Sequence, residues 1–201
     1  MATPLNAAQK QKINDALDLV TQILDCCDAL VAAGHMAPDP DSAKLRSNLT
    51  TLHSMMYTGK IDIDTTMWDA IGWTDGDGIH FDPDHPAFPL RPDGYPIMDA
   101  WFIIQTLLHE KYHYLYHTGF GAFRKLFNIP GFIVLGLLKF FGAHDGSLAW
   151  HETQAYWHAY RMLGVLERNL FWICLKNPGC IPDCEAHKLS VADARNKQKP
   201  H

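Results

Sequence analysis

The sequence has none of the features that usually mark a membrane-spanning, secreted or nucleic-acid-binding chain. Its most apolar run, residues 132–141, is ten residues long, whereas a helix needs about 20 residues to cross a bilayer. Residues 1–20 hold neither a basic leading stretch nor a continuous apolar stretch, so no secretory signal is predicted. The net charge is −5 and the basic residues are scattered, which argues against nucleic acid as a partner.

The lack of these features leaves the cellular location of the chain open. The chain is expected to stay in the cytoplasm, to leave it by a route that reads no such signal, or to be a piece of a longer chain. Residues 129–142 are interpreted as a buried helix or a hydrophobic loop, and contact of this segment with a membrane is the less favoured alternative. The oligomeric state is not predicted.

Cysteine is present without a recognisable zinc or disulfide pattern. No CxxC pair occurs in Cys174-x5-Cys180-x3-Cys184, which argues against a zinc knuckle. The total of five cysteines is odd, which argues against a complete disulfide framework. Cys26 and Cys27 lie in a helical pattern and are interpreted as core residues. A local Cys180–Cys184 disulfide, or one from this region to Cys26 or Cys27, stays open for an oxidising compartment.

The length and composition predict one domain over residues 1–201. A chain of 201 residues with 47% hydrophobic residues can bury a proper core. Apolar residues spaced three and four apart predict N-terminal helices within residues 7–58. The first helix is expected over 7–33, ended by Gly34. The second is expected to start after a cap at Asp41 or Ser42 and to close at Gly59.

Together with the rest of the sequence, after Gly59, these helices predict a mainly α (α+β) fold with a small β-sheet or hairpin beside a long helix. Alternating residues predict strands at 61–64 and at 78–82, the latter at a sheet edge because Pro83 follows it. The other expected segments are a proline-rich loop at 83–97, a helix over 98–118 with Gly119 just beyond it, a short helix at 120–128, a helix over 148–175 capped by Asp145 or Ser147, and a frayed polar tail at 185–201.

The most informative motif contains one of only four glutamates in the chain: His109-Glu110-Lys111-Tyr112-His113. Residues i and i+4 of a helix share one face, so His109 and His113 can bind the same metal ion. A glutamate between them can take a proton from a metal-bound water. The mostly apolar residues 100–108 lead directly into the motif, and this favours a buried helix, in which a metal would satisfy the two imidazoles.

A catalytic zinc ion usually has three protein ligands, and Glu152 is the expected third. Glu152 and Tyr156 are four residues apart, Ala155 permits close helix packing, and Trp150 and Trp157 suggest that the region is buried. Asp145 is the second candidate, although helix capping competes for it. His117 is too far along the helix from His109 to share one ion, and His151 is about 100° around the helix from Glu152.

These residues resemble those of a known family. HExxH followed by glutamate in an ExxAY setting is similar to the zincin metallopeptidases that use a glutamate as third ligand, the gluzincin-like group. An Ile-x-Phe-Asp-Pro strand, a loop and then the HExxH helix resemble compact zincin domains of bacterial secreted effectors and toxins, including those fused to VgrG spike proteins of type VI secretion. The resemblance covers about residues 76–160.

The resemblance implies a zinc-dependent peptidase that acts on a peptide or protein, with residues 60–160 as its catalytic core. His109, His113 and Glu152 would bind Zn²⁺. Glu110 would be the general base and would later protonate the leaving amine. The strand at 78–82 would offer its open edge to an extended peptide.

The sequence leaves alternatives for the oxyanion donor, for the residues that orient the histidines and for the function itself. Tyr156 is the first candidate to stabilise the oxyanion, ahead of His151, His158 and Tyr160. Asp99 or Gln105 would orient the histidines. The competing functions are a membrane-acting toxin or a helical binding module with a structural zinc site, and hydrolysis of another bond such as an amide of cell-wall peptide.

Overall fold

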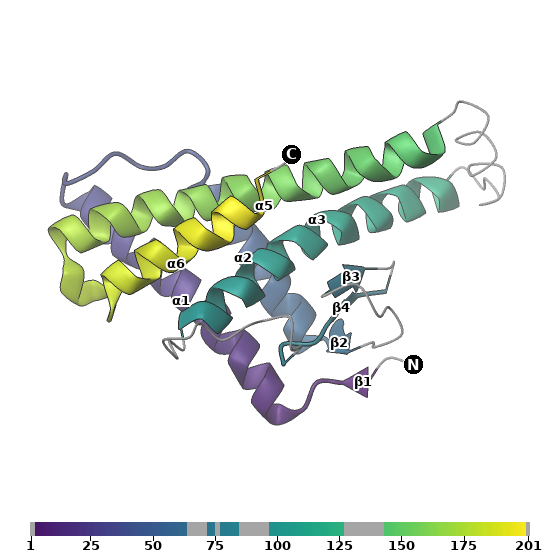
Figure 1. The fold of residues 1–201 in the computed structure, drawn as a ribbon, viewed down its shortest axis with the longest axis horizontal. Coiled ribbons are helices and arrows are strands. Elements are labelled where there is room, and N and C mark those ends of the chain that lie inside the picture. Colours follow the sequence, from purple (N-terminus) through teal and green to yellow (C-terminus); the bar gives the residue numbers. More distant parts are fainter. Residues whose placement is uncertain (1–2, 64–71, 75–76, 85–96, 127–142, 200–201) are drawn as a thin grey trace.

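The structure is a computed structural model, and it describes residues 3–63, 72–74, 77–84, 97–126 and 143–199 (Figure 1). The expected mainly helical fold with a small sheet is confirmed. The helices are α1 (Ala7–Ala32), α2 (Ser42–Tyr57), α3 (Ile97–Leu126), α5 (Ala143–Lys176) and α6 (Cys184–Lys197), with a 3-10 turn, η1 (Pro178–Cys180). The strands are β1 (Thr3–Pro4), β2 (Ile61–Ile63), β3 (Gly72–Thr74) and β4 (Ile79–Phe81).

The two N-terminal helices match their prediction. α1 begins with a capping box in which Asn6 and Gln9 satisfy each other's backbone N–H groups. Gly34 and Gly59 follow α1 and α2 with φ of +74° and +69°, a conformation that glycine adopts without strain. Asp41 stands at the predicted cap position of α2 but makes no capping hydrogen bond. Its carboxylate instead accepts two hydrogen bonds of 2.8 Å from Arg161 of α5.

The sheet corrects one prediction that matters for substrate binding. The strand order is β1-β2-β4-β3, with β4 parallel to β2 and antiparallel to β3. The strand predicted at 78–82 therefore exists as β4 but lies inside the sheet and not at its edge. Pro83 follows the strand and so leaves its hydrogen bonds intact. The edge next to β4 is formed by β3, which was not predicted because three residues are too short to show an alternating pattern.

Both long helices extend past the predicted ends. α3 continues through Gly119 to Leu126, so this glycine does not end it and no separate helix exists at 120–126. A glycine inside a helix costs about 1 kcal/mol, which neighbouring residues can offset. α5 begins at Ala143, so Asp145 and Ser147 lie within the helix and do not cap it. The expected helix or loop at 129–142 and most of the expected loop at 83–97 lie outside the described residues.

The C-terminal segment is ordered, which corrects the expectation of a frayed tail. α6 packs along α5 and α3 through a stripe of buried residues spaced three and four apart: Cys184, His187, Val191 and Ala194. Disulfides join Cys174 to Cys184 and Cys26 to Cys180, while Cys27 is buried and free. The local Cys180–Cys184 alternative is wrong, and the alternative with a link to Cys26 is confirmed. α6 is a polar helix with few apolar residues to pack, and the crosslinks help to keep this part of the chain on the rest of the molecule.

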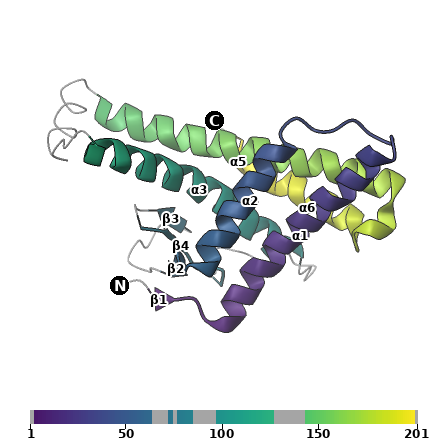
Figure 2. The same cartoon turned by 180° about the vertical axis from the view of Figure 1, so that it is seen from behind.

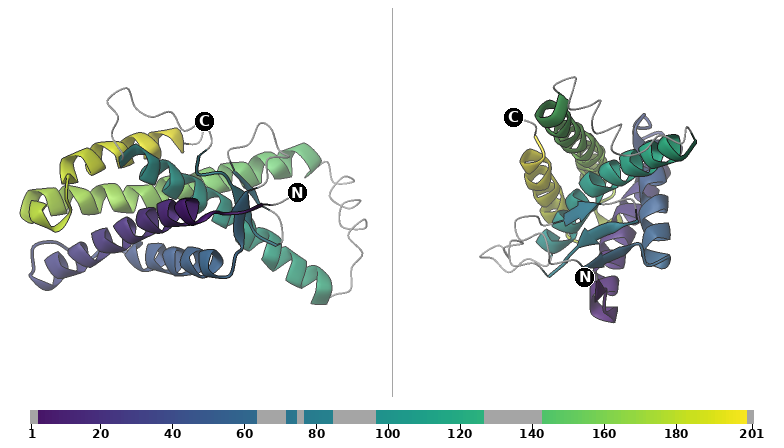
Figure 3. Two further views of the ribbon diagram at one scale, coloured as in Figure 1. Left: turned by 90° about the horizontal axis from the view of Figure 1, so that it is seen from below. Right: turned by 90° about the vertical axis from the view of Figure 1, so that its right-hand side faces the viewer.

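α5 crosses α3 and runs in the opposite direction, and the sheet lies on the other side of α3 (Figures 1, 2 and 3). α1 and α2 complete the bundle next to the sheet, as the end-on view in Figure 3 shows. α3 is thus covered on both sides, and Trp101, Ile104 and Leu107 are buried in one common core. None of the described helices has the length and apolar character that crossing a membrane requires.

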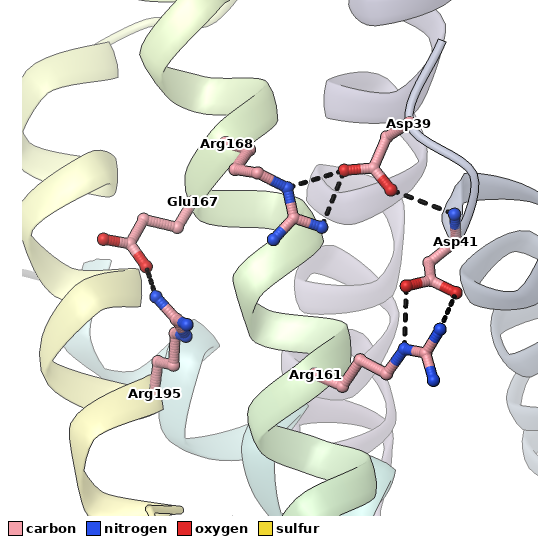
Figure 4. A network of polar contacts seen from close by, with 6 residues as sticks. All are labelled: Asp39, Asp41, Arg161, Glu167, Arg168 and Arg195. Atoms are coloured by element: carbon pink, nitrogen blue, oxygen red, sulfur yellow. Dashed lines mark hydrogen bonds and ion pairs between the residues drawn. The ribbon is translucent and has the colours of Figure 1, made fainter.

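Ion pairs fix α5 against its neighbours (Figure 4). The connection between α1 and α2 holds Arg161 through Asp41 and Arg168 through Asp39, the latter pair at 2.7 Å. On the other side, Arg195 of α6 donates to Glu167 of α5 at 2.6 Å. Exposed ion pairs contribute little free energy each, about 0–1 kcal/mol. Their consequence is geometric, because they set the position of α5.

A buried polar chain also joins α3, α2 and α5. Lys111 donates to Oδ1 of Asn48 at 2.5 Å, and Nδ2 of Asn48 lies 3.1 Å from Nε2 of His158. Because the amide oxygen faces the lysine, the amide donates to His158, which must accept as a neutral ring. Burial, with Lys44 and Lys111 nearby, lowers the pKa of His158 to about 4. Burial likewise lowers the pKa of Lys111 to about 8.

The disulfides generate a test of stability. The Cys26–Cys180 bond joins residues 154 apart and the Cys174–Cys184 bond joins residues ten apart. Loop-closure entropy gives an upper value of about 5 kcal/mol for the first and about 3 kcal/mol for the second. We expect the Cys26→Ser/Cys180→Ser variant to lose more unfolding free energy in urea than the Cys174→Ser/Cys184→Ser variant. The reverse order would show that native contacts, and not chain entropy, dominate.

His158 generates a test of pH dependence. Its pKa is lower in the folded chain than in the unfolded chain, where it is about 6.5, so the unfolded chain binds more protons between pH 6.5 and 4. Stability contributed by the neutral ring is therefore present above pH 6.5 and lost as the pH falls through 4. In His158→Gln, whose amide oxygen can still accept from Asn48, we expect the unfolding free energy to fall less over this range. Equal slopes in both proteins would contradict the assignment.

Candidate metal centre

His109 and His113 meet on one face of α3. They are four residues apart, their ring centroids are 4.9 Å apart, and their Nε2 atoms are 3.2 Å apart. The two side chains are 11% and 13% exposed. Apolar residues at 101–104 and 107–108 are buried and fix this part of α3 in the core. The predicted pairing of the two imidazoles is therefore present.

Glu152 comes from α5 and completes the cluster. Its two carboxylate oxygens lie 3.3 Å from Nε2 of His109 and 3.3 Å from Nε2 of His113. Ala155 and Ala159 are fully buried on α5, and small residues let two helices approach closely. The expectation of a buried surrounding is wrong, since the Glu152 side chain is 54% exposed and Trp157 is 50% exposed. One side of the cluster therefore faces solvent.

The spacing of these atoms suits a metal ion. The three residues offer ligand atoms that all lie within 4.8 Å of one another. In a tetrahedral site with bonds of about 2.0–2.1 Å, neighbouring ligand atoms are about 3.3–3.4 Å apart. The Nε2 atoms of His109 and His113, 3.2 Å apart, agree with that value, and each of them lies 3.3 Å from a different oxygen of the Glu152 carboxylate. His109, His113 and Glu152 can thus hold a metal ion, with the exposed side left for a fourth ligand.

Glu110 lies beside the cluster and is 7% exposed. Burial raises the pKa of its carboxyl group, and His109 and a hydrogen bond from Thr74 act in the opposite direction. The Thr74 hydroxyl of β3 is 2.8 Å from Oε2 of Glu110. The sequence identified Glu110 but not Thr74, because the hydroxyl comes from a strand that was not predicted.

Gly72 lets β3 lie against α3 at this point. A methyl group added to Gly72 would be 3.0 Å from Cγ2 of Thr106 and 3.3 Å from Cγ of Glu110. Gly72 and Thr74 are two residues apart in a strand, so both face α3. The absence of a side chain at the first position brings the hydroxyl at the second within reach of the carboxylate.

Tyr156 is the aromatic residue at the cluster, as predicted. Its ring lies edge-on to His109 with a centroid distance of 4.6 Å, and the side chain stays partly exposed. Burial, followed by Glu152 and Glu110, raises the pKa of its phenol, so it can donate a hydrogen bond at neutral pH. The alternatives point elsewhere: His158 bonds Asn48, and Tyr160 packs under Arg195 at 4.2 Å.

Gln105 is the described residue that could orient the ring of His109. Nδ1 of His109 and Oε1 of Gln105 are both buried, and neither has a hydrogen-bond partner among the described residues. Gln105 precedes His109 by one helical turn, so its side chain can reach the ring by rotation. The predicted orienting role thus suits Gln105, although no hydrogen bond joins the two.

The other candidates cannot be compared at the level of side chains. His117 lies on α3, and Asp145 and His151 lie on α5. Their side chains, like that of Asp99, are outside the described residues. The unbroken course of α3 through residue 117 agrees with the expectation that His117 does not share an ion with His109.

Comparison with known proteins adds no relative. No protein-family model matches the chain, and neither the curated proteins nor the solved structures give a match.

The cluster generates a test of metal binding. We expect Zn²⁺ to bind once per chain and to raise the melting temperature, because an ion that binds the folded chain stabilises it. Glu152→Gln keeps the size of the side chain but removes its charge, and it should weaken Zn²⁺ binding by about 100-fold or more, since changes outside the ligand shell already cost about 10- to 100-fold. Glu185→Gln, an exposed glutamate of α6, is the matched control and should bind like the wild type. Equal Zn²⁺ affinity in all three proteins would show that Glu152 is not a ligand, and a wild type that binds no Zn²⁺ would show that the cluster is only an ion pair.

Proposed function

We propose that this chain is a zinc-dependent metallopeptidase. The observation that carries the proposal is the convergence of His109, His113 and Glu152 from two helices, with Glu110 buried beside them. Two imidazole nitrogens and one carboxylate are a known donor set for catalytic zinc, in which a water molecule completes the coordination. The exposure of Glu152 leaves room for that water and for substrate.

The residues divide the chemistry among them. Bound zinc would lower the pKa of its water and polarise the scissile carbonyl. Glu110 accepts the proton and later passes it to the leaving amine. Tyr156 donates a hydrogen bond to the negative charge that develops on the carbonyl oxygen, and its raised pKa supports this role.

A peptide is the substrate class that the sheet supports. β3 pairs with β4 on one side, and no strand of the described residues pairs with its other side. An extended peptide can pair with such an edge through its backbone. This position is beside the site, because Thr74 of the same strand contacts Glu110. β3 therefore takes the role that the sequence gave to the strand at 78–82.

The two disulfides support a place of action outside the cytoplasm. Disulfides persist in oxidising compartments and are rare in the cytosol. The Cys26–Cys180 and Cys174–Cys184 bonds agree with a secreted effector or toxin. The role as an effector also depends on the family resemblance of the motif.

The general base provides the test. Glu110→Gln is expected to keep about one Zn²⁺ per chain and to lose activity about 100-fold or more, since proton transfer by a placed side chain contributes about 10²–10⁴ in rate. Activity is measured by mass spectrometry on a digest of an unbiased peptide library, and Glu185→Gln serves again as the control. A Gln variant as active as the wild type would contradict the mechanism. A zinc-loaded wild type that cleaves no peptide would contradict the substrate class.

A further inference from the structure

The carboxylate of Glu110 is buried and needs a partner that fixes its direction. The outer torsion of a glutamate side chain is broad, so burial alone leaves the two oxygens free to exchange positions. Among the described residues, the hydrogen bond to this carboxylate that the structure shows comes from Thr74, at 2.8 Å from Oε2. A base that must take a proton from one direction benefits from such an anchor.

Thr74 is itself held firmly. Its backbone pairs with Ile79 of β4, which is fully buried. Threonine is branched at Cβ, and this restricts its first side-chain torsion. Gly72 permits the close contact of β3 with α3 that brings the hydroxyl to Glu110. The donor is therefore placed by the fold before any ligand arrives.

The Thr74 hydroxyl has a second acceptor in reach, the backbone carbonyl of Glu110 at 3.1 Å. A hydroxyl has one proton and donates to one acceptor at a time. Hydrogen bonds to an ionised acceptor are about twice as strong as those between neutral groups. The ionised carboxylate, which is also the nearer acceptor, therefore accepts the hydrogen bond from the Thr74 hydroxyl. The ionised state is the one in which Glu110 can act as a base.

We propose that Thr74 is a positioning residue for Glu110: its hydroxyl holds Oε2 and leaves Oε1 as the oxygen that accepts the proton. This inference rests on the proposed peptidase function. It adds Thr74, a residue of the edge strand β3, to the residues that take part in the proposed reaction. The strand that offers its backbone to the substrate would also direct the base, so that both are set by one element.

The test compares two substitutions in the full-length, zinc-loaded chain. Thr74→Val removes the hydroxyl and keeps the branched shape, while Thr74→Ser keeps the hydroxyl. We expect kcat on one peptide that the library digest identifies to fall about 10- to 100-fold in the Val variant, in line with loss of one hydrogen bond to a charged group. KM and zinc content should stay within about twofold, and the Ser variant should recover most of kcat. Thr50→Val, on the exposed face of α2, is the control for a threonine-to-valine change.

A second measurement reads the hydrogen bond without activity. The chain has four glutamates, so labelling their carboxyl carbons with ¹³C gives four NMR signals, and Glu110→Gln identifies one by its loss. In the metal-free protein, we expect this signal to move in Thr74→Val and to return in Thr74→Ser, while the other three stay in place.

The two measurements separate the possible failures. A Val variant with wild-type kcat, a Ser variant as slow as Val, or an unmoved Glu110 signal overturns the role of Thr74. If Glu110→Gln remains fully active, or if the wild type cleaves no peptide, the proposed function fails and the catalytic role of Thr74 fails with it. In that case the NMR signal still shows whether the hydroxyl holds Glu110.

Discussion

The site depends on the place where α5 crosses α3. Two imidazoles on one helical turn are available from the sequence alone, but the third ligand must come from another helix. The crossing brings the Glu152 carboxylate to 3.3 Å from both rings. Fully buried Ala155 and Ala159 permit the approach. The ion pairs of Arg161 and Arg168 and the buried contact of Asn48 with His158 further attach α5 to α2 and to the connection before α2.

The same crossing concentrates groups that are costly to bury. Lys111 and Glu110 are almost fully buried on α3, next to the histidines of the motif. A buried polar group without a partner costs about 1–3 kcal/mol, and a charged group costs more. Within the described part of the chain, Asn48 is the hydrogen-bond partner of Lys111 and Thr74 is that of Glu110. Asn48 lies on α2 and Thr74 on β3. The elements packed around α3 therefore also supply hydrogen-bond partners for its buried polar residues.

The sequence predicted the residues of the site better than their surroundings. The spacing of His109, Glu110 and His113 on a helix is a local property, and the pairing of Glu152 with Tyr156 is local as well. The structure brings these five together. What failed depends on distant contacts: the internal position of β4 requires knowledge of β3, and the order of α6 comes with its packing on α5 and α3 and its disulfide to Cys174. Thr74, Asn48 and Gly72 were missed for the same reason, because their importance lies only in what faces them.

A function as a zinc peptidase requires that three side chains from two helices bind one zinc ion. Anomalous X-ray diffraction at the zinc absorption edge, from crystals grown with Zn²⁺, locates the ion. We expect a single strong peak about 2.0–2.2 Å from Nε2 of His109, Nε2 of His113 and a carboxylate oxygen of Glu152, the bond lengths of a tetrahedral site. Zinc bound elsewhere, or bound by the two histidines with the Glu152 carboxylate turned away, would contradict it.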